Sequence, residues 1–299
     1  VLTFFLFLLV VSRLYDPLQG ALQNLAAVIS TRTNIARMNE ILDHPIQQGE
    51  NRLSNKGYDI TFDHVGFAYN TGETVLKDVS FTAKQGEVTA LVGPSGGGKT
   101  TVSRLAARFW DVSRGKITVG GVDVKAVDPE ELLKAYAIVF QDVTLFNNTV
   151  MENIRYGRLD ATDEEVIQAA KAASAHSFIM RLSKGYQTEL TGDGANLSQG
   201  QRQLLNIARA SLSKAPILVL DEATSSVDTR TERLIEEGMN RLMQNRTTFI
   251  IAHRLSTVRN ANAILVLEHG RIIERGDHQE LLAQKGKYYQ LYTGNLAEN

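Results

Sequence analysis

Residues 93–100 read Gly93-Pro94-Ser95-Gly96-Gly97-Gly98-Lys99-Thr100, and this stretch decides the fold. It matches the pattern G-x-x-x-x-G-K-[ST], in which glycines let backbone N–H groups turn inward and bind phosphate. The apolar stretch 87–92 precedes it, and apolar residues at helical spacing follow over 100–109. We therefore predict a strand, a phosphate-binding loop and a helix, whose positive N-terminal end adds to the attraction for phosphate.

Each residue type in this loop suits one part of a nucleotide. Lys99 is expected to reach the β- and γ-phosphates and to act in catalysis, and the Thr100 hydroxyl is expected to bind Mg²⁺. The nucleotide-binding residues expected in and directly after the loop are Gly93, Ser95, Gly96, Gly97, Gly98, Lys99, Thr100 and Thr101.

A second stretch joins an apolar strand to two carboxylates. Residues 217–220 are Ile-Leu-Val-Leu, and Asp221 and Glu222 follow directly. Ligands of open α/β sheets bind at the carboxyl ends of the strands. We therefore expect Asp221 to hold Mg²⁺ and Glu222 to polarise the attacking water as general base. Taken alone, the pair also fits an ordinary strand that ends in a solvated acidic turn.

Short apolar runs alternate with helical patterns from residue 58 onward. Residues 60–67 predict a strand with a bulge, and further strands are predicted at 79–83, 137–140, 217–220, 248–251 and 264–267. Short apolar strands separated by helices are typical of a mostly parallel sheet that is covered on both faces. The fold class is therefore α/β.

The first 57 residues have a different character. Residues 1–11 are almost wholly apolar, but crossing a bilayer takes about 20 residues, and no signal-peptide pattern accompanies the run. We interpret it as the cytoplasmic half of a transmembrane helix; the alternative is a buried core helix of a soluble protein. An amphipathic helix is predicted over 18–42, Pro45 is expected to stop it, and the polar residues 47–57 are typical of a linker.

Composition excludes several kinds of site and partner. The formal net charge of −1 gives no field that would attract nucleic acid. Because the chain has no cysteine, disulfides, thiolate nucleophiles and cysteine-ligated metals are excluded.

A third stretch, Leu197-Ser198-Gln199-Gly200-Gln201, opens a predicted helix over 202–212. Alone it fits a plain helix cap, since serine often caps helices. When this stretch is taken together with the two stretches above, the chain resembles the ATP-binding cassette family over about 58–299. The signature of that family is written LSGGQ, and Gln199 here replaces its first glycine. The resemblance implies ATP and Mg²⁺ as cofactors, with Ser198, Gly200 and Gln201 as further nucleotide-binding residues.

The resemblance also gives roles to residues whose ordinary interpretation is structural. Tyr69, otherwise a core tyrosine, matches the aromatic residue that stacks on adenine. Gln141, otherwise a solvated loop residue, matches a catalytic glutamine that binds Mg²⁺ and water. Residues 225–228 resemble a loop that crosses a dimer interface, and His253 resembles the switch histidine that acts in catalysis.

For the whole chain, the resemblance implies a P-loop NTPase cassette with an antiparallel β subdomain and a helical subdomain. We expect the end of the last transmembrane helix and its extension at 1–45, a linker at 46–57 and the cassette at 58–299. The expected activity is ATP hydrolysis that powers export across the cell (inner) membrane, with the cassette on the cytoplasmic side. Expected partners are a second cassette, identical or different, the chain's own membrane domain and a transported substrate, and no nucleic acid.

Other functions within this resemblance stay open at this point. The exporter scaffold also suits uptake of siderophore-like cargo, and a soluble cassette ATPase that acts on DNA or in translation shares the same ATP chemistry. A non-catalytic cassette is a further alternative, against which the presence of Glu222 and His253 argues.

The resemblance gives two further segments a role in communication between domains. Residues 143–156 are expected to receive the intracellular loops of the membrane domain, with Phe146 important for coupling. The loop 191–194 departs from the commonest exporter pattern, which has a glutamate there, and Asp193 is the candidate to replace it.

Overall fold

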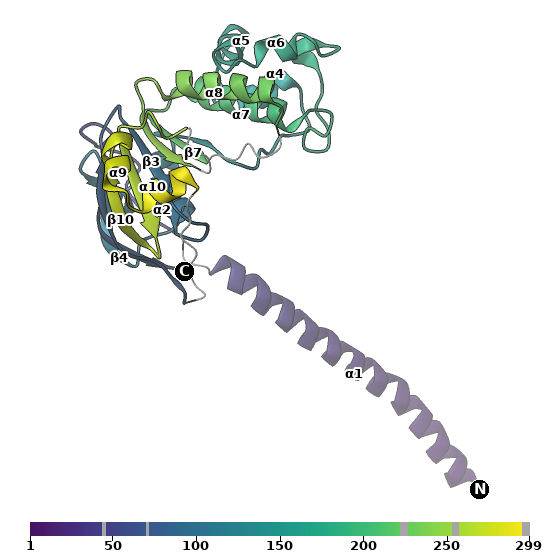
Figure 1. Ribbon diagram of the computed structural model, residues 1–299. Coiled ribbons are helices and arrows are strands. Elements are labelled where there is room, and N and C mark those ends of the chain that lie inside the picture. The colour runs from purple at the N-terminus through teal and green to yellow at the C-terminus, as the bar shows by residue number, and fades with distance from the viewer. Residues whose placement is uncertain (44–45, 70–71, 222–226, 253–256, 295–299) are drawn as a thin grey trace. The chain divides into compact units, whose positions relative to one another are not determined.

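The computed structural model describes residues 1–43, 46–69, 72–221, 227–252 and 257–294. The chain divides into two compact units, Val1–Gln47 and Gln48–Asn299. The first unit holds the helix α1 (Leu2–Leu42), and the second holds two sheets and the remaining described helices (Figure 1).

Helix α1 is one continuous helix of 41 residues with Pro17 inside it, where the sequence indicated an apolar run and a separate helix. A proline inside a helix removes one backbone hydrogen bond at a cost of about 3 kcal/mol. The helix nevertheless runs through Pro17 without interruption.

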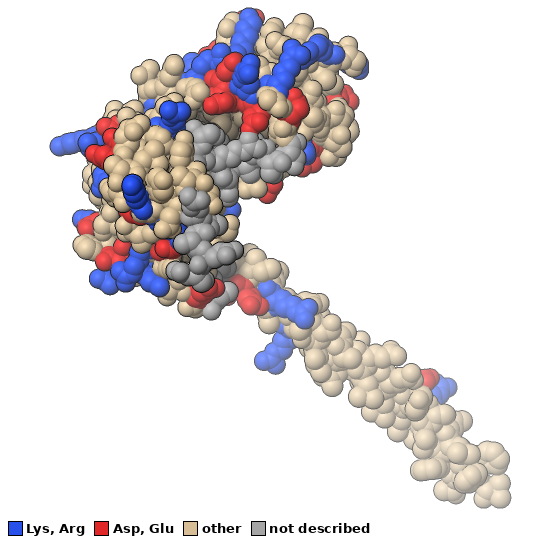
Figure 2. All heavy atoms as spheres, viewed as in Figure 1, with Lys and Arg blue, Asp and Glu red and all other residues tan. Residues whose placement is uncertain are grey.

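No residue of α1 is buried within its unit, and the helix is long and apolar enough, by length and composition, to cross a membrane. Its surface is mainly uncharged, with basic and acidic groups near its C-terminal end and one further basic and acidic pair towards its N-terminal end (Figure 2). At about 1.5 Å per residue, its length is roughly twice the hydrocarbon thickness of a bilayer. The first unit by itself therefore does not bury this apolar surface.

The larger sheet has six strands in the order β10-β9-β3-β8-β7-β6. All neighbours are parallel except β9 and β10, which confirms the mostly parallel sheet. In this order the strands are β10 (Arg271–Gly276), β9 (Ala263–Glu268), β3 (Val88–Val92), β8 (Thr247–Ile251), β7 (Ile217–Asp221) and β6 (Tyr136–Val139). Strand β3 lies in the middle, so the loop that follows it opens at the centre of the carboxyl edge.

The smaller sheet is antiparallel, with the order β2-β1-β4-β5. Its strands are β2 (Thr74–Ala83), β1 (Ile60–Ala68), β4 (Arg114–Val119) and β5 (Val122–Asp123). The predicted bulge in the first strand is present as register shifts between Phe62, Val65 and Phe67. Phe81 stacks on Phe62 at 4.7 Å and meets Phe249 of β8 edge-on at 5.9 Å, so one aromatic core joins the two sheets.

A group of helices packs around α7 (Gln199–Ser213) within the second unit (Figure 1). Its neighbours are α4 (Val150–Arg155), α5 (Asp163–Ala172) and α8 (Thr229–Met243), with α6 (His176–Ile179) against α5. Helix α2 (Lys99–Ala106) follows the phosphate loop, α3 (Pro129–Leu133) precedes β6, and α9 (His278–Gln284) and α10 (Lys287–Thr293) follow β10.

Residues 48–50, inside the expected linker, belong to the second unit and are hydrogen-bonded to the rest of it. Glu50 N–H donates to the Ala126 carbonyl at 2.8 Å, and Asp128 N–H donates to the Glu50 carbonyl at 2.9 Å. The Arg108 side chain, only 2% exposed, donates to the carbonyls of Gln48 and Val127. This part of the connection is therefore held by the domain rather than free of it.

Candidate functional site

The phosphate loop lies against the backbone of a neighbouring strand, which explains its first glycine. Gly93 has φ 139°, and a Cβ atom placed on it would lie 2.0 Å from the Leu267 carbonyl oxygen of β9. Gly98 has φ 99° and is the N-cap of α2. Both positions need the left-handed backbone that glycine adopts without strain. The loop can therefore turn from β3 into α2 only with glycine at these two positions.

Lys99 lies over its own loop. Its Nζ donates to the carbonyl oxygens of Gly93 and Pro94, both at 2.9 Å, and the residue is only 7% exposed. Burial lowers the pKa of Lys99, and the nearby Asp221 carboxylate opposes that shift. These carbonyls hold the ammonium group within the loop where the motif places phosphate.

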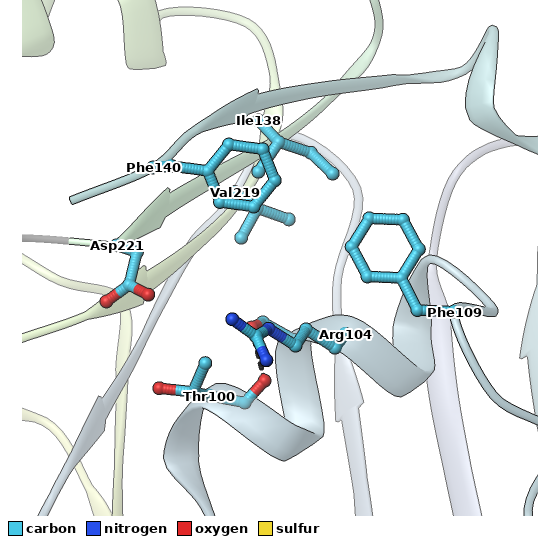
Figure 3. Close-up of a pocket in the computed structure, with 8 residues that line it drawn as sticks. Thr100, Arg104, Phe109, Ile138, Phe140, Val219 and Asp221 are labelled. Atoms are coloured by element: carbon cyan, nitrogen blue, oxygen red, sulfur yellow. Dashed lines mark hydrogen bonds between the residues drawn. The ribbon is translucent and has the colours of Figure 1, made fainter. Parts of the chain in front are cut away.

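Thr100, from the first turn of α2, and Asp221, from the end of β7, line one pocket (Figure 3). The other residues of the pocket wall are Ser103, Arg104, Phe109, Ile138, Phe140 and Val219. A hydroxyl and a carboxylate next to a phosphate loop are the protein ligands that Mg²⁺ takes together with substrate phosphates. No cluster of three or more His, Cys, Asp or Glu suited to a metal occurs within residues 1–43, 46–69, 72–221, 227–252 and 257–294. The donor set therefore fits a cation that is held partly by a nucleotide.

Tyr69 lies beside the same helix. Its hydroxyl is 3.0 Å from the Thr101 Oγ1, so the residue expected to stack on a base is connected to the residue that follows Thr100. The Tyr69 ring stands at 89° to the Trp110 ring with 5.2 Å between centroids. Trp110 was not singled out from the sequence. The aromatic pair 109–110 directly after the loop helix is the signal that points to it.

Ser198 is the N-cap of α7, and its contacts are local. Its Oγ accepts from the Gln201 N–H at 3.2 Å, and the Gln201 Oε1 accepts from the Ser198 N–H at 3.0 Å. This reciprocal capping satisfies two N–H groups at the helix start and leaves Ser198 exposed. Gly200 packs against α8, because an added Cβ would lie 2.4 Å from the Thr231 Cγ2. The signature therefore has a structural role in addition to the expected contact with nucleotide.

The expected nucleotide-binding residues lie in two separate places. Lys99, Thr100 and Asp221 share one site, next to the Tyr69–Thr101 pair. Ser198, Gly200 and Gln201 lie at the junction of α7 and α8, and no hydrogen bond or ion pair within the described ranges joins them to the phosphate loop.

Among the remaining expected positions, the structure describes Gln141 and Asp228. Gln141 is exposed just after β6. Glu222 and His253 lie outside the described residues, as do 225 and 226. Asp228 is the N-cap of α8 and accepts from the Thr231 N–H at 3.0 Å, and the hydrogen bonds from Thr231 lower the pKa of Asp228.

Comparison with known proteins agrees with the family resemblance that the sequence motifs indicated. The family model described as ABC transporter matches residues 76–225, half of the chain. The "Fatty acid ABC transporter ATP-binding/permease protein" of Mycobacterium tuberculosis is 48% identical over 257 residues, 85% of this chain and 41% of the relative. The "ATP-dependent lipid A-core flippase" of Desulfotalea psychrophila is 45% identical over 295 residues, 97% of this chain and 51% of the relative.

Among solved structures, a bacterial Atm1-family ABC exporter with ATP bound matches with a TM-score of 0.82 and 40% identity. The match covers 91% of this chain and 48% of that one. It confirms the cassette fold expected from the sequence. The chain spans about half the length of the curated relatives and of the exporter that it matches.

The packing of Gly200 predicts a stability effect that is separate from nucleotide binding. Gly200→Ala is expected to lower the free energy of unfolding by about 1–3 kcal/mol, because the new Cβ is forced against Thr231 and overpacks the α7–α8 contact. Thr231→Ser removes the Cγ2 and should restore part of that loss in the double variant. Urea denaturation followed by circular dichroism measures both effects, with Thr231→Ser alone as control. Unchanged stability of Gly200→Ala would contradict the packing role.

Proposed function

Because the chain belongs to the ABC transporter family, we propose that it is the ATP-hydrolysing cassette of a membrane exporter together with the end of that exporter's last transmembrane helix. One observation carries the catalytic half of the proposal. The buried Lys99 within its glycine loop lies next to the pocket that Thr100 and Asp221 share. This arrangement suits the triphosphate of a nucleotide with a bound divalent cation.

Within that site each residue has one task. The Lys99 ammonium releases the Gly93 and Pro94 carbonyls and pairs with the β- and γ-phosphates. The Thr100 hydroxyl and the Asp221 carboxylate would hold Mg²⁺, which would neutralise phosphate charge during transfer. Gln141, Glu222 and His253 would orient and polarise the attacking water. Tyr69 would stack on the adenine base.

The signature residues would complete the site of a second cassette rather than their own. They lie on the α7–α8 junction, whereas Lys99 and Thr100 lie at the carboxyl edge of the sheet. A helix N-terminus with an exposed serine offers donors and partial positive charge to a γ-phosphate. We propose that ATP joins two cassettes, identical or different, by lying between one phosphate loop and the partner's signature, and that hydrolysis separates them.

The first unit supports a membrane location. Helix α1 is exposed and contains a stretch that is apolar enough to cross a membrane. Arg32 and Arg37 lie in the part that leads to the cassette, and Arg13 lies nearer the N-terminus. Positive residues on the cytoplasmic side of a membrane helix are the usual arrangement. We assign 1–45 to the last transmembrane helix and its extension, 46–57 to the connection and 58–299 to a cassette on the cytoplasmic side of the inner membrane.

The flippase and exporter relatives favour export over siderophore-like uptake, and α1 disfavours a soluble ATPase.

An exposed aromatic pair supports coupling to a membrane domain. The Phe146 and Tyr156 rings, 49% and 46% exposed, lie 4.6 Å apart beside the Arg209 guanidinium. Arg209 donates to the Thr144 carbonyl at 2.6 Å and to the Asn153 Oδ1 at 2.8 Å. These hydrogen bonds fix the guanidinium group against which the two rings pack. An apolar surface that is exposed but rigid is suited to receive the loops of a membrane domain.

ATP hydrolysis tests the catalytic proposal. We expect the rate per molecule with Mg-ATP to rise with protein concentration, because two chains must meet, and to stop when EDTA removes Mg²⁺. Glu222→Gln should lower the rate about 100-fold or more, since it removes the general base but keeps the size of the side chain. A rate that is independent of concentration and survives this substitution would overturn the mechanism.

Transport tests the coupling proposal. In a transporter that contains this cassette and its membrane domain, Phe146→Ala should abolish substrate movement while ATP hydrolysis stays within about twofold, because the docking surface lies outside the ATP site. Leu159→Ala is the matched control, since Leu159 is 75% exposed and does not belong to the aromatic pair. Transport by Phe146→Ala at the rate of the unaltered protein would contradict a docking role for this surface.

A further inference from the structure

Three aromatic rings contact one another around Tyr69, the residue that is proposed to stack on the base. The Tyr69 ring stands at 84° to the Phe67 ring, with centroids 4.9 Å apart, and at 89° to the Trp110 ring, with centroids 5.2 Å apart. Phe67 and Trp110 also contact each other at 6.3 Å. Phe67 is 4% exposed and belongs to the core, whereas Trp110 is 38% exposed. Tyr69 is therefore held by one buried ring and by one ring at the surface.

Trp110 reaches Tyr69 because the turn after α2 is fixed by a buried arginine. Arg108 has φ 55°, a left-handed conformation that is uncommon for a residue with a side chain. Its guanidinium pairs with Asp111 at 2.8 Å and donates to the carbonyls of Gln48 and Val127. Trp110 lies between the two paired residues, so its backbone position is set by contacts that do not involve nucleotide.

We propose that Trp110 is a positioning residue for base recognition, which holds the Tyr69 ring in the plane on which the adenine base of ATP stacks. The proposal rests on the proposed function in one respect, that Tyr69 is the stacking residue. The proposed ATP site does not itself include Trp110.

The geometry explains why such a residue is needed. A tyrosine ring can turn about two side-chain torsions, and stacking on a base selects one orientation, so an unrestrained ring loses affinity when it is ordered on binding. In this structure two perpendicular rings and the Thr101 hydroxyl restrain Tyr69. Phe67 is buried and its removal would disturb the core. Trp110 is 38% exposed, so its substitution disturbs the core less than that of Phe67.

The substitution of Trp110 is expected to change affinity only for ligands that carry the adenine base. A perpendicular aromatic pair contributes an amount that corresponds to about a 2- to 10-fold change in an equilibrium constant. Trp110→Leu should therefore raise the Kd for Mg-ATP by about that factor. The Kd for Mg-tripolyphosphate, which has no base, should stay within about twofold. Trp110→Phe keeps a ring at this position and should restore most of the affinity for ATP.

Isothermal titration calorimetry on the full chain in detergent micelles measures these constants. Tyr292→Leu is the matched control for loss of an aromatic residue at the surface, because Tyr292 is 39% exposed and packs on His278 and Tyr288 instead. It should leave both dissociation constants unchanged. The positioning role further requires that Trp110→Leu has no additional effect in a Tyr69→Leu background, since there is then no ring to hold.

The outcomes separate this proposal from the proposed function. If Tyr69→Leu weakens ATP but not tripolyphosphate and Trp110→Leu has no effect, the role of Trp110 is wrong and stacking on Tyr69 stands. If the two substitutions weaken ATP independently, Trp110 contacts the base itself and the positioning role is overturned. If Tyr69→Leu leaves ATP binding unchanged, stacking on Tyr69 is wrong and the role of Trp110 is excluded with it.

Discussion

The backbone of Gly93 approaches the Leu267 carbonyl of β9 so closely that a single added methyl group would lie 2.0 Å from that oxygen. This approach is possible because β3 pairs with β9 on one side and with β8 on the other, which places the start of the phosphate loop at the centre of the carboxyl edge. Lys99 and Thr100 follow from that position, because they begin the helix into which the loop turns. Asp221 reaches the same pocket because its strand, β7, pairs with β8 in the same direction.

The signature residues, which are also expected to bind nucleotide, lie away from the phosphate loop. The signature residues are positioned by the packing of α7 on α8, and their polar groups are satisfied by one another. The phosphate loop, the pocket of Thr100 and Asp221 and the Tyr69 ring belong to one part of the domain, and the exposed N-terminus of α7 belongs to another. Two copies of such a domain can each supply what the other lacks. This is the physical basis for the proposed coupling between ATP binding and the association of two cassettes.

Local patterns predicted the parts of the fold that depend on local chemistry. The glycine loop, the buried strand before Asp221 and the bulge in β1 each have a signal within a few residues. Strand β10 was not predicted, because it is an edge strand in which polar residues such as Arg271 and Glu274 interrupt the apolar pattern. The contacts of Tyr69 with Trp110, 41 positions along the chain, and of Arg108 with Gln48 depend on tertiary packing, which no local pattern reveals. Glu222 and His253 lie outside the described residues. The role of Glu222 therefore rests on its place after an apolar strand and on the resemblance, and that of His253 on the resemblance.

Complementation between two inactive variants shows whether each ATP site is built from two chains. One variant would carry Lys99→Ala and the other Ser198→Arg, and each alone should hydrolyse ATP at a very low rate. Mixing them produces pairs in which an intact phosphate loop meets an intact signature, so the account predicts that hydrolysis reappears in the mixture, up to about half the rate of the unaltered pair per dimer of mixed type. A mixture that shows only the sum of the two separate rates would contradict a shared site.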